Sequence, residues 1–287
     1  MKILIVIRSA VHQNDNANIK LDNGNIILYK DYLILEFGKS LLKKNINVEI
    51  ITLNNLKKQK NILEFLNKYK IVIKFSLRET IFDSEKNCIF KKSKPDIIFL
   101  ESPILFRDPL KKLKYQKYIR IMLNENFGNN KFIKKYYDNS QRLNKMNLKL
   151  KKWKDKGEVI LVINQLRGDS AIIPINPYDW LIECISSIRK LTNKKILIRE
   201  HPLQKKIDTD RMQEILNGKN IFLSNSQTIH KDLEDAFTCV TFSSGSAIDS
   251  LIEGVPVIAT DKRSFAYEIS ENNITFKRNI LTIDCAR

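Results

Sequence analysis

Two patterns of hydrophobic and polar positions alternate along the chain. Short runs of apolar, mostly β-branched residues predict buried strands, and apolar residues at three- and four-residue spacing predict the helices between them. In the first half, strands are predicted at 2–7, 45–52, 71–75, 95–100 and 117–123. Helices are predicted at 26–42 and 56–69, a polar loop at 9–25, and a helical or irregular segment at 82–94. Strands that alternate with helices in this way indicate a parallel sheet with right-handed crossovers.

The segment 129–157 interrupts this alternation. It is strongly basic, contains no strand pattern and ends at Gly157, so we interpret it as a connection between two domains. A second series follows, with strands predicted at 158–164, 195–199, 221–223, 238–242 and 256–259 and helices at 178–192, 208–216, 229–236 and 247–253. The chain is therefore predicted to form two β/α domains, 1–150 and 151–287, with a cleft between them.

Polar loops follow two of the predicted strands in the second half. The strand 195–199 leads to His201-Pro202, and the strand 238–242 leads to Ser243-Ser244-Gly245-Ser246 and then directly into a helix. Hydroxyl residues and a glycine at such a turn present backbone N–H groups that suit a phosphate. An ordinary helix N-cap in the serine loop, and a structural histidine before a proline, are the alternatives.

Composition adds a net charge of +18. This charge indicates either a polyanionic partner, such as nucleic acid, an acidic glycan or an anionic membrane face, or a compositional bias toward Lys, Asn and Ile. There is no run of about 18 uncharged apolar residues, so no transmembrane segment is expected. The start of the chain resembles a strand and not a signal peptide. We expect a cytoplasmic protein, with the inner membrane face as an alternative location.

The sequence also argues against several kinds of site. The four cysteines form no Cys-x-x-Cys pair and are expected to be reduced thiols, mainly in the core. Three scattered histidines make a zinc site unlikely. Neither a G-x-G-x-x-G motif after the first strand nor a P-loop is present, which argues against a Rossmann dehydrogenase and a P-loop enzyme.

Five short motifs in the second half resemble those of capsule-polysaccharide glycosyltransferases of the Kdo-transferase type, and of similar phage-encoded glycosyltransferases. They are N-Q-L-R-G-D-S-A at 164–171, E-H-P at 200–202, T-F-S-S-G-S-A at 241–247, E-G-V-P-V-I-A at 253–259 and S-F-A-Y-E at 264–268. Each motif alone is common, and the order and spacing give the combination its specificity. The resemblance implies a GT-B fold, with two Rossmann-like domains that face a cleft. It further implies a nucleotide sugar on the C-terminal domain, an acceptor on the N-terminal domain, and no metal or other cofactor.

The resemblance also suggests donor-binding residues. Ser243, Ser244 and Ser246 would bind the phosphate, Gly245 would allow close approach of the backbone, and His201, beside Pro202, would donate to the leaving group. Arg167 would pair with a phosphate or a sugar carboxylate, and Asp169, like Gln165 in the same motif, would contact the donor. Glu253 would hold the ribose, or would be only the C-cap of its helix.

The catalytic base is expected in the first half. Relatives carry an E-D-G-F-like motif with an acidic base, followed by a Y-Y-D element. Here Asn124-Glu125-Asn126-Phe127-Gly128 and Tyr136-Tyr137-Asp138 occupy comparable places, with Asn126 where the aspartate would be. Glu125 is our predicted base, with Glu101 second and Asp15 or Asp22 third. Relatives generally continue beyond the last motif, so we expect the C-terminal closing helix to be short or missing.

The sequence therefore predicts a metal-independent glycosyltransferase. It would move a sugar from a nucleotide sugar, CMP-Kdo or another, to a polysaccharide or a lipid-linked glycan. One alternative is a phage-type enzyme that glycosylates hydroxymethylated bases of DNA, which the charge would favour. Another is a catalytically inactive relative that binds nucleotide sugars, which the departure at Asn126 would favour.

Overall fold

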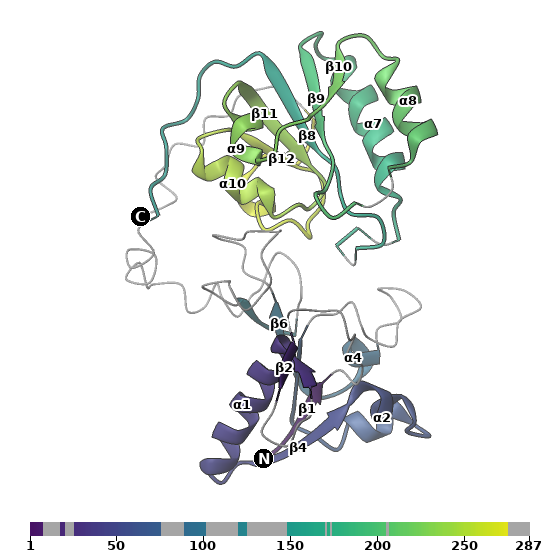
Figure 1. The fold of residues 1–287 in the computed structure, drawn as a ribbon, viewed down its shortest axis with the longest axis vertical. Coiled ribbons are helices and arrows are strands. Elements are labelled where there is room, and N and C mark those ends of the chain that lie inside the picture. The colour runs from purple at the N-terminus through teal and green to yellow at the C-terminus, as the bar shows by residue number, and fades with distance from the viewer. Residues whose placement is uncertain are drawn as a thin grey trace. The chain divides into compact units, whose positions relative to one another are not determined.

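The structure is a computed structural model, and it describes residues 1–7, 18–20, 26–75, 89–101, 120–124, 148–169, 171–172, 174–204 and 207–274 (Figure 1). Contacts within the chain divide it into two compact units. Unit 1 comprises Met1–Leu148 and Gly168–Pro174, and unit 2 comprises Lys149–Arg167 and Ile175–Arg287. Several residues singled out in the sequence lie outside the described ranges, namely Glu125, Asn126, Tyr136, Tyr137, Asp138, Asp15 and Asp22.

Unit 1 contains a five-stranded sheet in the order β4-β1-β5-β6-β7. The strands are β1 (Lys2–Ile7), β4 (Asn47–Thr52), β5 (Ile71–Phe75), β6 (Asp96–Glu101) and β7 (Arg120–Leu123). The first four are parallel, with neighbours in the order of a flavodoxin-like sheet. β7 is antiparallel to β6, so the prediction of a uniformly parallel sheet is wrong at this edge. Strand direction depends on the connection, which the local pattern does not encode.

The helices of unit 1 are shorter than predicted. The helix predicted at 26–42 is α1 (Tyr29–Lys43), and β3 (Ile26–Leu28) instead pairs with β2 (Asn18–Lys20). The helix predicted at 56–69 is two helices, α2 (Leu53–Lys57) and α3 (Ile62–Leu66). The side chain of Asn61 accepts a hydrogen bond from the backbone N–H of Glu64 at 3.1 Å. This N-cap begins a new helix in the middle of the predicted one.

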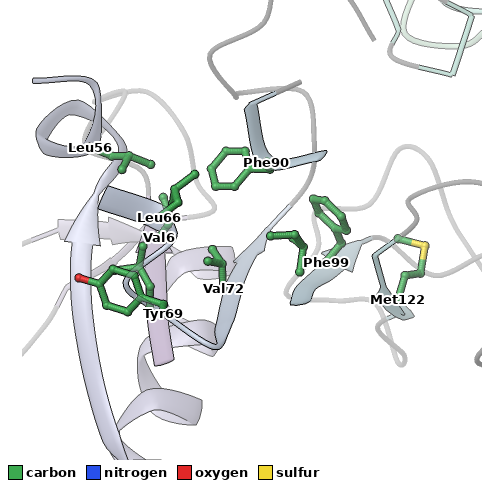
Figure 2. Close-up of a cluster of buried hydrophobic side chains, with 10 residues drawn as sticks. Val6, Leu56, Leu66, Tyr69, Val72, Phe90, Phe99 and Met122 are labelled. Atoms are coloured by element: carbon green, nitrogen blue, oxygen red, sulfur yellow. The ribbon is translucent and has the colours of Figure 1, made fainter. Parts of the chain in front are cut away.

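A hydrophobic cluster covers one face of the unit 1 sheet, between the strands and the short helices α2, α3 and α4 (Ile89–Lys92). Figure 2 labels members of this cluster from the strands, the helices and the turn before β5, namely Val6, Leu56, Leu66, Tyr69, Val72, Phe90, Phe99 and Met122. Leu56 and Leu66 are fully buried although each lies on a helix of five residues. Because such helices are too short to be stable alone, their packing on the sheet must hold them.

Unit 2 contains a second five-stranded sheet, entirely parallel, in the order β10-β9-β8-β11-β12. The strands are β8 (Val159–Ile163), β9 (Lys195–Arg199), β10 (Ile221–Leu223), β11 (Ala236–Thr241) and β12 (Val257–Ala259). Numbered along the chain, this order is the 3-2-1-4-5 of a Rossmann sheet, which reverses between β8 and β11. All five strands were predicted, with differences of at most two residues at their ends.

The helices of unit 2 are α7 (Pro177–Arg189), α8 (Thr209–Leu216), α9 (Ile229–Leu233), α10 (Ser246–Ile252) and the 3-10 helix η3 (Tyr267–Ile269). α7 begins as predicted, because Asn176 caps it and Pro177 follows as its first residue. α9 ends earlier than predicted, since Ala236 already belongs to β11. No described helix has the length and hydropathy of a membrane span.

The cysteine prediction holds where the structure can test it. Cys184 and Cys239 are buried and form no disulfide, and Cys88 and Cys285 lie outside the described residues. Burial raises the pKa of the Cys239 thiol to about 12. Cys184 and Cys239 are therefore unreactive core residues at neutral pH.

The segment 149–157 has no strand, as predicted, and no helix, and it is bound along unit 2. The backbone N–H of Lys151 donates to Ile252 O at 2.9 Å, and that of Lys154 donates to Gly254 O at 2.8 Å. Gly254 has φ +73°, and a Cβ there would lie 2.1 Å from the carbonyl oxygen of Lys152. Only glycine fits between the end of α10 and this segment.

Candidate functional site

Three neighbouring strands of unit 2 end at the same edge of the sheet, because they are parallel. Asn164-Gln165 follows directly after β8, Glu200-His201 follows directly after β9, and β11 leads to the serine loop 243–246. The strand order reverses between β8 and β11, where open α/β sheets bind their ligands. The fold thus gathers the predicted residues Gln165, His201 and the serine loop at one edge.

Gln165 joins the two sides of this reversal point. It is buried, and its side-chain oxygen accepts hydrogen bonds from the backbone N–H groups of Ser243 at 3.1 Å and Ser244 at 2.6 Å. The amide orientation follows from the donors that face it. The expectation that these two N–H groups are exposed to an anion is therefore not met in this structure. The Gln165 oxygen is the acceptor that these two N–H groups face.

The rest of the serine loop forms the start of α10. Ser244 Oγ accepts from the backbone N–H of Ser246 at 3.2 Å, and Ser244 O accepts from Ala247 N at 3.1 Å. Ser246 is the first helical residue and not the N-cap, which is Gly245. Gly245 has φ −60°, and a Cβ built on it meets no atom of the described residues within 4 Å. The backbone therefore does not require a glycine here, and the described part of the chain leaves open space in front of it.

His201 is held in a defined tautomer. Its Nδ1 accepts a hydrogen bond from the backbone N–H of Leu203 at 3.1 Å, so in the neutral ring Nε2 carries the proton. In the same turn, Gln204 accepts from the backbone N–H of Arg167 at 3.2 Å, while Pro202 and Arg167 are exposed. The β8 and β9 loops are thus tied together by the contact between Arg167 and Gln204.

Glu200 is a half-buried residue at this edge to which the sequence motif had assigned no role. Asn164 Nδ2 donates to Glu200 Oε1 at 2.8 Å, and Oε2 is shielded from solvent with no hydrogen-bond partner among the described residues. Burial raises the pKa of the Glu200 carboxyl, against the smaller lowering effect of Asn164. The sequence feature that could have singled out Glu200 is its position as an acidic residue directly after a buried strand.

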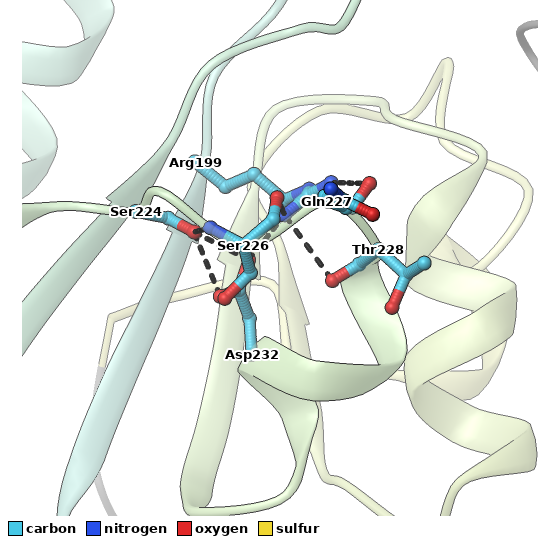
Figure 3. A network of polar contacts seen from close by, with 6 residues as sticks. All are labelled: Arg199, Ser224, Ser226, Gln227, Thr228 and Asp232. Atoms are coloured by element: carbon cyan, nitrogen blue, oxygen red, sulfur yellow. Dashed lines mark hydrogen bonds and ion pairs between the residues drawn. The ribbon is translucent and has the colours of Figure 1, made fainter.

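Arg199, one position earlier, belongs to a separate polar network (Figure 3). It pairs with the buried carboxylate of Asp232 and donates to the carbonyl oxygen of Ser226 at 3.1 Å. Ser224 Oγ lies 2.7 and 2.8 Å from the two carboxylate oxygens of Asp232. The network attaches the loop 224–228 and α9 to the end of β9, and so it fixes the strand end that carries Glu200 and His201.

Arg263 is a cationic residue near the serine loop that the sequence analysis did not single out. The guanidinium of Arg263 stacks on the ring of Phe242, 4.8 Å from its centroid, directly before Ser243. Asp261 accepts from Arg263 Nε at 2.7 Å and from Nη2 at 3.2 Å. Such a pair is planar and bidentate, and it fixes the direction of the guanidinium.

Two predicted donor-site residues lie apart from this cluster. Glu253 is the C-cap of α10, about 10 Å along the helix from Ser246. It forms an ion pair with Lys151 and lies 3.4 Å from His230 Nδ1. The pKa of the Glu253 carboxyl is lowered, and Lys151 is the main cause. The geometry supports the alternative role of a plain helix cap.

Asp169 folds back on its own turn. Its Oδ1 accepts from the backbone N–H of Ala171 at 2.9 Å, and its carbonyl oxygen accepts from Ile172 at 3.0 Å. Asp169 falls in unit 1, whereas Gln165 and Arg167 fall in unit 2. Within unit 2, the structure therefore gathers Gln165 but not Asp169 with the serine loop.

In unit 1, the antiparallel direction of β7 separates the two candidate regions for the base. Asn124 follows β7 and accepts from the backbone N–H of Ile97 at 2.7 Å, while its amide donates to Asp96 at 3.0 Å. Asn124 therefore lies at the amino end of β6, and Glu101 lies at the carboxyl end, about 13 Å along the strand. The runner-up Glu101 is at the edge where ligands bind, and Asn124, which precedes Glu125, is at the opposite edge.

Comparison with known proteins supports a glycosyltransferase-like fold. No protein-family model matches the chain, and no curated protein matches its sequence. A solved structure described as Thermosulfurimonas dismutans KpsC, beta Kdo 2,7 transferase, is similar with a TM-score of 0.54 and 15% identity, covering 96% of this chain and 84% of that one. The beta Kdo 2,4 transferase of the same KpsC gives 13% identity and a TM-score of 0.48, which is too low to support an argument.

The first of these similarities confirms, for the fold, the resemblance noted in the sequence. The chain has a Kdo-transferase-like glycosyltransferase fold, with two mostly parallel α/β sheets.

Proposed function

We propose that the protein is a glycosyltransferase of GT-B type that transfers a sugar from a nucleotide sugar to a glycan or lipid-linked acceptor. The observation that supports this most is the polar edge of unit 2. A Rossmann-order sheet there carries Gln165, His201 and the serine loop around the point where its strand order reverses. The Kdo-transferase-like fold makes CMP-Kdo the first donor to test.

The proposed chemistry uses groups of the chain itself. A phosphate leaving group gains negative charge in the transition state, and fixed N–H and O–H donors stabilise that charge. We assign this task to the backbone N–H of Gly245, the hydroxyls of the serine loop and the Nε2–H of His201. Gln165 would give up its bonds to Ser243 and Ser244 when the phosphate arrives. This part of the proposal requires no metal ion.

The acceptor hydroxyl needs a base, and position decides among the candidates before pKa does. We propose Glu101, because it lies at the carboxyl end of β6, where an open α/β sheet binds its ligand. Glu125 remains the alternative suggested by the sequence.

The donor part of the proposal can be tested by thermal shift. We would heat the protein with CMP, UDP, GDP and dTDP, and with CMP-N-acetylneuraminate and UDP-glucose as stable nucleotide sugars. A ligand at about 100 times its dissociation constant adds about 2.7 kcal/mol of stability. One nucleotide class should raise the melting temperature.

The matched variant is Gly245→Ala. It should fold like wild type, since φ is −60° and the new methyl meets no atom of the described residues. It should nevertheless lose the shift, because the methyl would occupy the ligand's space. No shift with any nucleotide would refute the proposal and would direct attention to nucleic acid as the partner of the basic chain.

A further inference from the structure

Glu200 is a carboxyl whose environment suits its neutral form. One N–H group, from Asn164, contacts Oε1, and Oε2 is buried without a partner among the described residues. Ionised carboxylates in protein interiors are normally paired or accept several hydrogen bonds. The ionised form of Glu200 would leave charge on an oxygen that nothing in the described chain compensates.

The charged groups around Glu200 do not supply that compensation. Arg199 directs its guanidinium to Asp232 and to the carbonyls of the loop 224–228. On α7, Tyr178 is close enough to interact electrostatically with Glu200, Asp208 and Arg167, and its hydroxyl accepts from Asp208 N at 3.2 Å. His201 follows Glu200 and uses Nδ1 within its own turn. Arg167 is exposed, so water screens its charge.

The contact with Asn164 also fixes where the proton lies. Oε1 accepts from the Asn164 amide, so the proton of the neutral acid belongs on Oε2. A buried O–H group in turn needs an acceptor. Glu200 lies at the edge where the strands β8 and β9 end, one strand from the reversal point. Because Oε2 is shielded from solvent, a ligand bound there would bring such an acceptor once the atoms that cover Oε2 move aside.

We propose that Glu200 acts as a neutral carboxylic acid that donates its Oε2 proton to an acceptor oxygen of the bound nucleotide sugar. This inference rests on the proposed function of the unit 2 edge. The acceptor is a phosphate oxygen or an oxygen of the transferred sugar. Binding is then coupled to protonation, so a ligand that binds while Glu200 is ionised takes up a proton.

The experiment measures binding by calorimetry between pH 5.5 and 8.5 for wild type and Glu200→Gln. Glutamine keeps the shape and carries a donor but cannot titrate. The affinity ratio of wild type to Glu200→Gln should fall with pH, approaching about tenfold per unit above the pKa of Glu200. Since the ligand is the same in both proteins, its own titration cancels. Glu214→Gln, an exposed charge removal on α8, should follow wild type.

Proton uptake gives a second readout that needs no variant. Wild type titrated with CMP-N-acetylneuraminate or UDP-glucose, in buffers of different ionisation enthalpy, should take up a fraction of a proton that changes with pH. CMP and UDP then separate the two sources of the acceptor oxygen. Coupling retained with the nucleotide alone assigns it to the phosphate, and coupling seen only with the complete nucleotide sugar assigns it to the sugar.

Two results would overturn the inference in different ways. Binding with a pH-independent affinity ratio and no proton uptake means that Glu200 is only structural, while the proposed function stands. Absence of nucleotide and nucleotide-sugar binding in wild type and in both variants removes the proposed function and this inference with it.

Discussion

The side-chain oxygen of Gln165 lies 2.6 Å from the backbone nitrogen of Ser244, across the point where the strand order of unit 2 reverses. Phosphates are commonly bound at such points by backbone N–H groups. In this chain the carbonyl of a neutral side chain accepts from those groups and holds the loop in shape. Under the proposed function, a phosphate has to compete with Gln165 for them.

Substitution of Gln165 by Glu tests this competition. A carboxylate has the same shape and can accept from Ser243 and Ser244, so the variant should fold with near wild-type stability. It also places a negative charge where we expect the phosphate, and nucleotide affinity should fall at least about tenfold by repulsion. Calorimetric titration measures this, with Gln213→Glu on the exposed face of α8 as the charge-matched control. Unchanged affinity would show that the phosphate binds elsewhere.

Asp232→Asn should destabilise the protein strongly. The side chains of Asp232 and Arg199 are only 1% and 14% exposed, so the substitution leaves a largely buried guanidinium without its counter-charge. Removing one partner of such a pair costs about 3–5 kcal/mol, measured by urea unfolding.

The matched control for this variant is Asp179→Asn, which breaks the exposed pair between Asp179 and Arg211. It should cost less than about 1 kcal/mol. Equal losses in the two variants would mean that burial of the Arg199 pair is not what stabilises the end of β9.

Glu200 should make stability depend on pH in a defined direction. Burial raises its pKa in the folded protein, so the folded state prefers the protonated form. The stability that this group contributes is complete below its unfolded pKa of about 4.3 and is lost as pH rises through the higher folded pKa.

Glu200→Gln removes that loss. The variant should therefore gain stability relative to wild type as pH rises from 4 to 8, by about 1.4 kcal/mol per unit of pKa shift. Urea unfolding of both proteins across this range is the measurement, and parallel curves would contradict the prediction.

The same substitution at two glycines should have opposite consequences. Gly254→Ala places a Cβ 2.1 Å from Lys152 O at a φ of +73°, and should cost at least about 1–3 kcal/mol by displacing the segment 149–157. Gly245→Ala should change stability by less than about 1 kcal/mol. Thermal unfolding compares them directly, and similar losses at both would contradict the open space in front of Gly245.

Turnover rates of two variants distinguish Glu101 from Glu125 as the catalytic base. Glu101→Gln should lower turnover by about 10²-fold or more, with nucleotide affinity retained. Glu125→Gln should have a smaller effect if Glu101 is the base. Single-turnover kinetics with a competent donor and acceptor measures both, and the reverse order would restore the assignment to Glu125.

Much of the fold could be predicted because apolar runs mark buried strands regardless of context. Every described strand of unit 2 was found in this way. The break at Asn61 was missed because helical spacing continues through it, and only the side-chain bond to Glu64 shows the new start. The direction of β7 was missed because it depends on a connection, and with it the distance between Asn124 and Glu101.

The candidate site shows the same division between local and tertiary information. Loops after strands pointed to His201 and the serine loop, since position along a strand is a local property. The occupation of Ser243 and Ser244 by Gln165 joins residues almost eighty positions apart. The unpartnered oxygen of Glu200 depends on what Asn164 and Arg199 contact, and no spacing of residues encodes that.

The attachment of the segment 149–157 determines how the chain can be divided. Its backbone is bonded to Ile252 and Gly254, and the amine of Lys154 donates to the carbonyl oxygens of Leu233 at 2.6 Å and Glu234 at 2.7 Å. A fragment that starts at β8 would therefore expose the end of α9 and leave Gly254 without its neighbour. A separately expressed unit 2 should start at or before Lys149, because the segment 149–157 is hydrogen-bonded along its outer surface.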